Sequence, residues 1–317
     1  MNSQFKRYAL LAAIVVPAFT YFSIRSRPAY KQDRTKVFFR APGERYLEDS
    51  APAKTEARTD LPFALMSQAA YQRIPDKTNP CSEECLNADR ELIDAKWTMW
   101  GDFADDQLQK QIKQYHLRAE VWSNAEAKKV VVAFGGTEFS DLRDWLANLR
   151  WFIPWHEDQY TVVVKGFGPA FVNEYIKKRD SDSDYKFLSD PDTRLFSTGH
   201  SLGGGLAQQF AYSLEATENV PLVKQVYVFD PSPVTGFYRV EEALRTDNSK
   251  ELKIDRIYER GEILALLRSV EFFVYPDTKS NPAIRQVRYN LFSRAPIAGH
   301  SISKFAFKLD ETIKKVP

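Results

Sequence analysis

The sequence predicts an α/β fold built on a mostly parallel sheet, and the alternation of two kinds of segment carries this prediction. Short runs rich in valine and other strand-forming residues occur at 117–123, 129–136, 160–166, 193–199, 223–230 and 252–259. Helix-like stretches lie between several of them, at 141–149, 168–179 and 203–216. Strands that alternate with helices indicate βαβ units, and nearly continuous apolar runs are typical of strands buried on both faces. We therefore expect a twisted sheet with helices on both of its faces.

The boundaries of this domain follow from composition. Asp60 has the features of a helix N-cap, and the sequence DLPFALMSQAAYQ that it begins is amphipathic. The preceding residues, 28–59, are rich in Arg, Lys, Pro, Ala and Glu and lack a hydrophobic period, which is typical of a linker. The expected organisation is an N-terminal segment at 1–27, a linker at 28–59 and a single large α/β domain at 60–317.

Charge is distributed unevenly along the chain. The 317 residues contain 44 Lys and Arg and 42 Asp and Glu, for a formal net charge of +2. Residues 1–40 hold eight of the basic residues and one acid, so the remainder is weakly acidic. A domain that binds nucleic acid in general would itself be basic. The sequence therefore argues against a nucleic-acid partner, and the basic head needs a separate explanation.

That explanation is a membrane segment at residues 8–24, which carry no charge and are flanked by Lys and Arg on both sides. About 17 apolar residues is the lower limit for a helix that spans a bilayer. We expect 1–27 to be an uncleaved signal anchor or a cleaved signal peptide, with a buried soluble helix as the alternative. The body would then lie on the exported side, held at the membrane or secreted after cleavage.

The two cysteines, Cys81 and Cys85, are too few for a disulfide-rich scaffold. Their spacing allows a local disulfide, and two free thiols are also compatible with it. The Cys-x-x-Cys spacing typical of redox sites is missing here.

The most informative motif is Gly199-His200-Ser201-Leu202-Gly203-Gly204-Gly205. A predicted strand enters it and a predicted helix leaves it, as in the nucleophile elbow, where glycines let neighbouring backbone approach a strained serine. The helix N-terminus directs N–H groups at a developing oxyanion. We expect Ser201 to be a nucleophile; the alternative is a glycine-rich turn with a passenger serine.

A serine nucleophile needs a base and an acid. Of the four histidines, only His300 fits the order serine, acid, histidine of α/β-hydrolases. Asp230 ends one predicted strand and Glu262 follows the next, so both lie at the sheet edge where catalytic loops are found. Spacing alone does not decide between them.

Four blocks of residues 60–310 resemble the class 3 lipase family of the α/β-hydrolase fold. They are VVVAFGGTEFSDLRDWLANLRWF (130–152), KGFGPAFVNEY, STGHSLGGGLA, and the pair VFDPSPVTG and YERGEILALLR. The first block, which resembles the oxyanion turn of the family, is more specific than the elbow. Two departures stand out: Gly136 replaces the usual Arg of the oxyanion turn, and Lys165 stands where His is common.

The resemblance implies roles for particular residues. Thr137 and Leu202 would supply oxyanion N–H groups, and Glu262 would be the acid, with Asp230 as the alternative. The region around 139–155 would be a lid that contacts the acyl chain, through Trp145, Leu146, Leu149, Trp151 and Phe152; an ordinary helix with its apolar stripe on the core is the other interpretation.

These expectations combine into a serine carboxylic-ester hydrolase that uses Ser201, His300 and Glu262 and requires no metal or cofactor. A lipid or another long-chain ester is the expected substrate and the membrane the expected partner; the sequence leaves protein partners open. The alternative function is a non-catalytic, membrane-tethered protein that keeps a hydrolase-like fold, because fold does not fix function.

Overall fold

The computed structural model describes most of the chain from residue 33 onward. The described residues are 33–40, 49–72, 86–101, 103, 108, 110, 112, 114–115, 117–136, 159–215, 217–232, 235–261, 282–292 and 298–315. Arg34–Pro317 forms one compact unit, and all elements named here belong to it.

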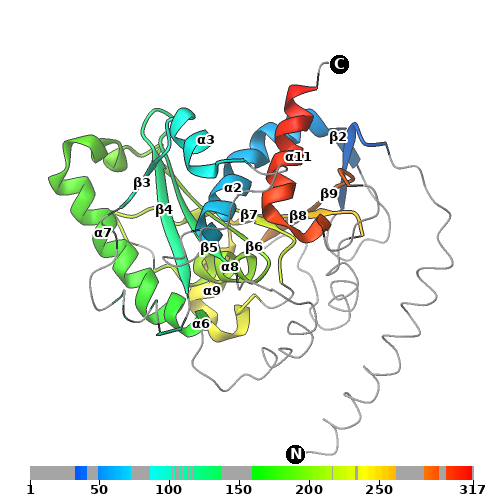
Figure 1. The fold of residues 1–317 in the computed structure, drawn as a ribbon. Coiled ribbons are helices and arrows are strands. Elements are labelled where there is room, and N and C mark those ends of the chain that lie inside the picture. The colour runs from blue at the N-terminus through cyan, green and yellow to red at the C-terminus, as the bar shows by residue number, and fades with distance from the viewer. Residues whose placement is uncertain are drawn as a thin grey trace, which may run out of the picture. The chain divides into compact units, whose positions relative to one another are not determined.

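A mixed sheet of nine strands is the centre of the described part (Figure 1). In spatial order its strands are β2 (Asp49–Pro52), β1 (Lys36–Arg40), β9 (Ala283–Tyr289), β8 (Lys253–Glu259), β7 (Val223–Phe229), β6 (Arg194–His200), β5 (Lys129–Gly135), β4 (Arg118–Asn124) and β3 (Thr98–Met99). Strands β5 to β9 are parallel to one another, and antiparallel strands extend the sheet at both edges. The predicted α/β fold with a mostly parallel sheet is confirmed.

The two faces of the sheet carry separate hydrophobic cores, because successive side chains of a strand point to opposite sides. In β5, Val130, Val132 and Phe134 belong to one core, and Val131 and Ala133 belong to the other. All five are fully buried. This explains the unbroken apolar run in the sequence: a strand covered on both faces has no solvent side.

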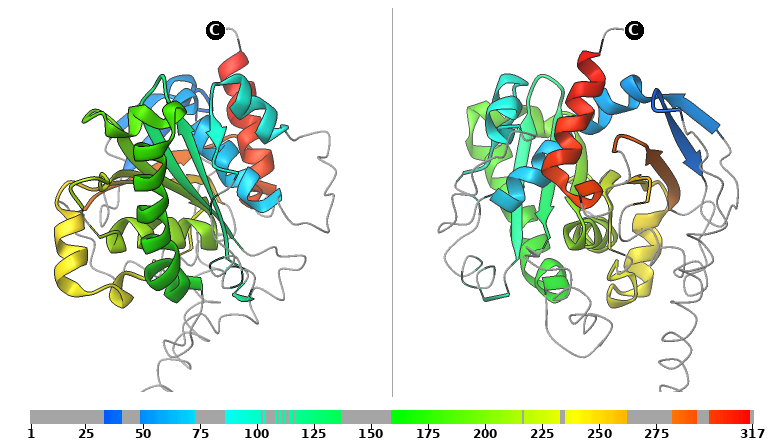
Figure 2. Two further views of the ribbon diagram at one scale, coloured as in Figure 1. Left: turned by 90° about the vertical axis from the view of Figure 1, so that its left-hand side faces the viewer. Right: turned by 45° about the vertical axis from the view of Figure 1, so that its right-hand side comes forward.

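Helices cover both faces (Figure 2). The first core is closed by α6 (Gln159–Val162), a π-helical turn (Val163–Phe167), α7 (Gly168–Ser181), α8 (Leu202–Ser213) and α9 (Glu242–Ser249). The second is closed by α2 (Ala53–Gln72), α3 (Ala88–Asp94) and α11 (Ile302–Lys314), and α2 packs directly against α11. Short 3-10 turns occupy Ser183–Ser189, Phe237–Arg239 and Ala298–His300.

The strand predicted at 160–166 is wrong, because these residues form α6 and most of the π-helical turn. Packing decides the outcome: Val163 and Phe167 are fully buried, and the Phe167 ring lies 5.3 Å from that of Phe134 and 5.9 Å from that of Phe210. The preference of valine for strands is weak enough that such tertiary contacts override it.

The predicted helix start and linker also need correction. Strands β1 and β2 and the first two turns of α2 lie within 28–59, so a linker is wrong for those residues. Asp60 is not an N-cap: it lies inside α2, is 1% exposed and accepts a hydrogen bond from Tyr289 Oη at 2.7 Å. A charged residue at the start of an apolar run resembles a cap in sequence, whereas here it is a buried polar contact.

Several predictions concern residues outside the described ranges. They are the membrane segment at 8–24, the cysteines Cys81 and Cys85, and the helix at 141–149. Within the described ranges, every helix is too short or too polar to cross a bilayer.

Candidate active site

Ser201 lies in a sharp turn between β6 and α8. Its backbone has φ 55° and ψ −122°, a conformation that is strained for any residue except glycine, and the residue is 2% exposed. Neighbouring backbone is very close: a Cβ on Gly199 would lie 2.3 Å from the Gly203 carbonyl oxygen, and one on Gly203 would lie 2.2 Å from that of Phe134. Two glycines are therefore required for this turn, which has the conformation of a nucleophile elbow.

His300 ends the 3-10 turn that precedes α11, so the packing of α11 on α2 holds it at the site. Its Nε2 lies 3.3 Å from Ser201 Oγ. This separation is slightly longer than the roughly 2.6–3.2 Å typical of a hydrogen bond between a general base and its nucleophile. The structure thus brings together two residues that are 99 positions apart in the sequence.

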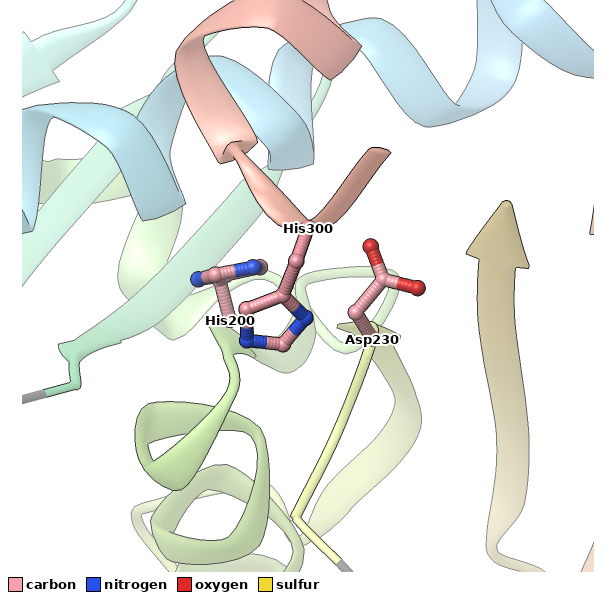
Figure 3. A group of neighbouring side chains, drawn as sticks. All are labelled: His200, Asp230 and His300. Carbon is pink, nitrogen blue, oxygen red and sulfur yellow. The ribbon is translucent and has the colours of Figure 1, made fainter. Parts of the chain in front are cut away.

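Asp230 follows β7 and has a φ of 40°. Its N–H donates to the carbonyl of Ile257 at 2.8 Å, and its Oδ1 accepts the N–H of Glu259 at 3.2 Å. The residue is 1% exposed, and in Figure 3 its side chain lies beside His300. One side-chain donor atom each from His200, Asp230 and His300 lies within 4.8 Å of the other two. Of the two candidate acids, Asp230 is next to His300, whereas Glu262 lies outside the described residues.

Leu202 is the first residue of α8 and is buried. The first N–H groups of a helix lack acceptors within that helix and carry its positive end of the dipole. In hydrolases with this elbow, an N–H group at this position helps to hold the oxyanion. Thr137 and the candidate lid residues Trp145, Leu146, Leu149, Trp151 and Phe152 lie outside the described residues.

The structure gives a reason for Gly136, the departure from the usual Arg. A Cβ at this position would lie 2.1 Å from Tyr71 Oη and 2.9 Å from the carbonyl oxygen of His200. Tyr71, near the end of α2, fills the space that a side chain at 136 would need. The presence of Gly136 therefore follows from the approach of Tyr71 to the elbow.

Sequence reasoning missed the contact of Tyr71 with His200. Tyr71 Oη donates to the His200 carbonyl oxygen at 3.2 Å and lies 3.0 Å from His200 Nδ1. The His200 ring packs against that of His300 with centroids 4.7 Å apart. The sequence offers no signal for this arrangement, because 129 residues separate Tyr71 from His200.

Glu259, the last residue of β8, is a second residue that the sequence did not single out. Its carboxylate accepts the backbone N–H groups of Leu291 at 2.9 Å and Phe292 at 3.2 Å. Burial raises the pKa of Glu259 to about 7, while these and the Arg260 N–H act in the opposite direction. Glu259 thereby connects the strand beside Asp230 to the segment that leads to His300.

The sequence around this site matches a known family. Residues 131–267 match the family model described as Lipase (class 3). The chain therefore contains a region that is similar to class 3 lipases. The resemblance predicted from the sequence is confirmed over these residues, and the match supports carboxylic ester hydrolase activity. The matched region includes Ser201, Asp230 and Glu262 and ends before His300.

Solved structures that are similar to the chain include fungal lipases. The native Rhizomucor miehei lipase propeptide complex is 16% identical, with a TM-score of 0.42, covering 78% of this chain and 75% of that one. Lipase II from Rhizopus niveus is 15% identical, with a TM-score of 0.38 and coverage of 74% and 79%. Lip2 lipase from Yarrowia lipolytica is 16% identical, with a TM-score of 0.37 and coverage of 67% and 74%. No curated protein sequence matches the chain.

Proposed function

We propose that this lipase-like ester hydrolase acts through a catalytic triad of Ser201, His300 and Asp230. The observation that carries the proposal is the 3.3 Å approach of His300 Nε2 to the hydroxyl of a serine in a strained elbow. Strain of this kind persists only where the surrounding structure enforces it, and it is concentrated at functional sites. A serine without a catalytic role in a glycine-rich turn would give no reason for a strained backbone or for a histidine beside its hydroxyl.

The proposed reaction proceeds through an acyl-enzyme. Ser201 Oγ attacks the ester carbonyl carbon while His300 Nε2 takes its proton. Backbone N–H groups of Leu202 and Thr137 would hold the oxyanion of the tetrahedral intermediate. His300 then gives the proton to the leaving alkoxide, and a water molecule attacks the acyl-enzyme with His300 as its base.

Asp230 is our choice as the acid, in place of Glu262. Its carboxylate lies beside His300, it is fully buried, and the Glu259 N–H fixes one of its oxygens. An acid in this role orients the imidazole and stabilises its charged form without taking the proton. Glu262 remains the candidate that the family resemblance implies, so the two acids call for a direct kinetic comparison.

The proposed substrate is a lipid or another long-chain ester, and the proposed location is a membrane. Support for both comes from the sequence: the uncharged segment at 8–24 with its basic flanks, and the apolar residues around 139–155. A hydrolase anchored through 8–24, with its body on the exported side, would act on esters in or on the bilayer.

A fluorophosphonate probe tests the chemistry on the full chain. We expect a covalent adduct on Ser201, its loss in Ser201→Ala, and full labelling of Ser189→Ala, which removes an exposed serine of the 3-10 turn at Ser183–Ser189. Labelling that survives in Ser201→Ala would refute the triad. A wild-type chain without any adduct would favour the non-catalytic alternative.

A panel of esters with increasing acyl length tests the substrate. Hydrolysis that rises toward long-chain glycerides or phospholipids presented in vesicles supports a lipase, with Ser201→Ala as the blank. A strict preference for acetyl or butyryl esters would contradict it. Separation of membranes from soluble protein after expression tests the anchor, and a chain that begins after residue 27 would indicate cleavage.

A further inference from the structure

Three potential metal ligands converge where β6 and β7 end (Figure 3). They are His200, Asp230 and His300, which together form the His–Asp–His cluster. His200 and Asp230 are 5% and 1% exposed, and His300 is partly buried. We propose that this cluster is an inhibitory binding site for a divalent transition-metal ion, with Zn²⁺ as the preferred ion.

The kinds of donor atom favour zinc. Two imidazoles and one carboxylate form a common three-ligand set for Zn²⁺, with a fourth position open to water or substrate. Ca²⁺ and Mg²⁺ prefer sites made of oxygen atoms alone, so neither should compete at similar concentrations. Because free Zn²⁺ binds only deprotonated ligands, the neutral imidazoles and an ionised Asp230 are the forms that hold it.

The spacing is close to what an ion requires. The three donor atoms lie within 4.8 Å of one another. Around a tetrahedral Zn²⁺ with bonds near 2.1 Å, donors lie about 3.4 Å apart. To hold the ion, the cluster therefore has to contract by about 1.4 Å at most.

Two contacts behind the ligands match those found around metal sites. The Tyr71 hydroxyl donates to the His200 carbonyl at 3.2 Å and lies 3.0 Å from His200 Nδ1. In the tautomer with its hydrogen on Nδ1, that nitrogen donates to the hydroxyl and the lone pair of the ring is on Nε2. On the other side, the Glu259 N–H donates to one oxygen of Asp230. Such outer contacts fix the orientation of ligating side chains and raise metal affinity.

Inhibition would follow from the use of His300 as a ligand. A histidine whose lone pair is bound to Zn²⁺ cannot take the Ser201 proton, and the ion also draws Asp230 away from its orienting role. This consequence for activity rests on the proposed function. The binding of the ion does not, so the two can be tested separately.

Binding is measured on the full chain without any substrate. Zn²⁺ is titrated against a chromophoric chelator, and Co²⁺ is used alone for its visible absorption in a site with nitrogen and oxygen ligands. Wild type and Ser201→Ala should each bind one ion per chain. His200→Gln should lose at least tenfold in affinity, whereas the control His116→Gln, which replaces a histidine that is not part of the cluster, should bind as wild type does.

Unchanged Zn²⁺ affinity in His200→Gln would overturn the site. If that variant fails to fold, as judged by circular dichroism, Asp230→Asn is titrated in its place: weaker binding supports the site and equal binding overturns it. Hydrolysis is then assayed with ZnCl₂ and reversed with EDTA. We expect the concentration for half inhibition to rise at least tenfold in His200→Gln. Zinc binding by a chain without esterase activity would refute the proposed function and leave the site standing.

Discussion

The backbone N–H of Glu259 donates to Oδ1 of Asp230, and the two atoms are 3.2 Å apart. The carboxylate of the same glutamate accepts the N–H groups of Leu291 and Phe292, in the chain segment that leads to His300. One buried residue at the end of β8 thus holds both the proposed acid and the approach to the proposed base. Glu259 does not touch Ser201 in the described structure. Its proposed role is therefore to position Asp230 and His300.

Glu259→Ala should therefore lower kcat about 10- to 100-fold and leave KM nearly unchanged, because misplacement of a catalytic group by about 1 Å can cost about 10²-fold in turnover. Glu259→Gln keeps one oxygen acceptor and should recover part of the loss. Steady-state kinetics with a soluble ester separate the two constants. Glu251→Gln, at an exposed residue paired with Lys224, is the control. A kcat for Glu259→Ala equal to that of the control would show that the link has no catalytic role.

Asp230→Asn should reduce kcat by about 10⁴, the loss seen when an orienting carboxylate becomes an amide and selects the wrong histidine tautomer. Glu262→Gln should change kcat by less than about tenfold on the same argument, because Asp230 occupies the place beside His300. Both variants are assayed with one substrate at saturation, and their unfolding curves are compared with that of wild type. A larger loss of kcat in Glu262→Gln than in Asp230→Asn would show that Glu262 is the acid.

Local signals in the sequence are sufficient to predict the nucleophile elbow. Ser201 was predicted from the glycines around it, and those glycines prove to be sites where a Cβ would collide with backbone. His300 followed from chain order, and the structure brings it to the serine. The parallel strands β5 to β8 were also predicted, because burial on both faces produces an apolar run that is visible in the sequence.

Long-range contacts explain what could not be predicted. Strands β1 and β9 pair across more than 200 residues, and their partly exposed patterns lack a strong apolar alternation. The valines at 162–164 form helical turns and not a strand, because the packing of Phe167 against neighbouring aromatic rings holds this segment in a helical conformation. Tyr71 and Glu259 act through hydrogen bonds to distant segments, so no local pattern marks them.

Gly136→Ala should destabilise the fold, because the new methyl group would lie 2.1 Å from Tyr71 Oη and 2.9 Å from the His200 carbonyl. Insertion of a methyl group into a packed site costs about 1–3 kcal/mol. Tyr71→Phe in the same chain removes the closer atom and should restore part of that loss, so the double variant should be more stable than the sum of the single effects. Urea unfolding of wild type, the two single variants and the double variant measures this coupling. Strict additivity would show that Gly136 and Tyr71 do not compete for space.

Because of Asp60, the free energy of unfolding should decrease as the pH rises. Burial raises its pKa from 3.8 to about 8, with the charges of Asp255 and Glu56 adding to the shift and the Tyr289 hydroxyl opposing it. The folded chain therefore holds this proton more tightly than the unfolded chain. The stabilising contribution is complete below about pH 4 and is lost progressively as the pH rises through about 8, where the folded carboxyl also ionises.

Asp60→Asn tests this pH dependence, because the amide keeps a polar group next to Tyr289 but cannot ionise. The unfolding free energy of this variant should decline less than that of wild type between pH 5 and about 9. Urea denaturation across this range compares the two slopes, with Asp247→Asn, at an exposed residue paired with Lys250, as the control for general charge effects. Parallel slopes for wild type and Asp60→Asn would contradict a buried, protonated Asp60.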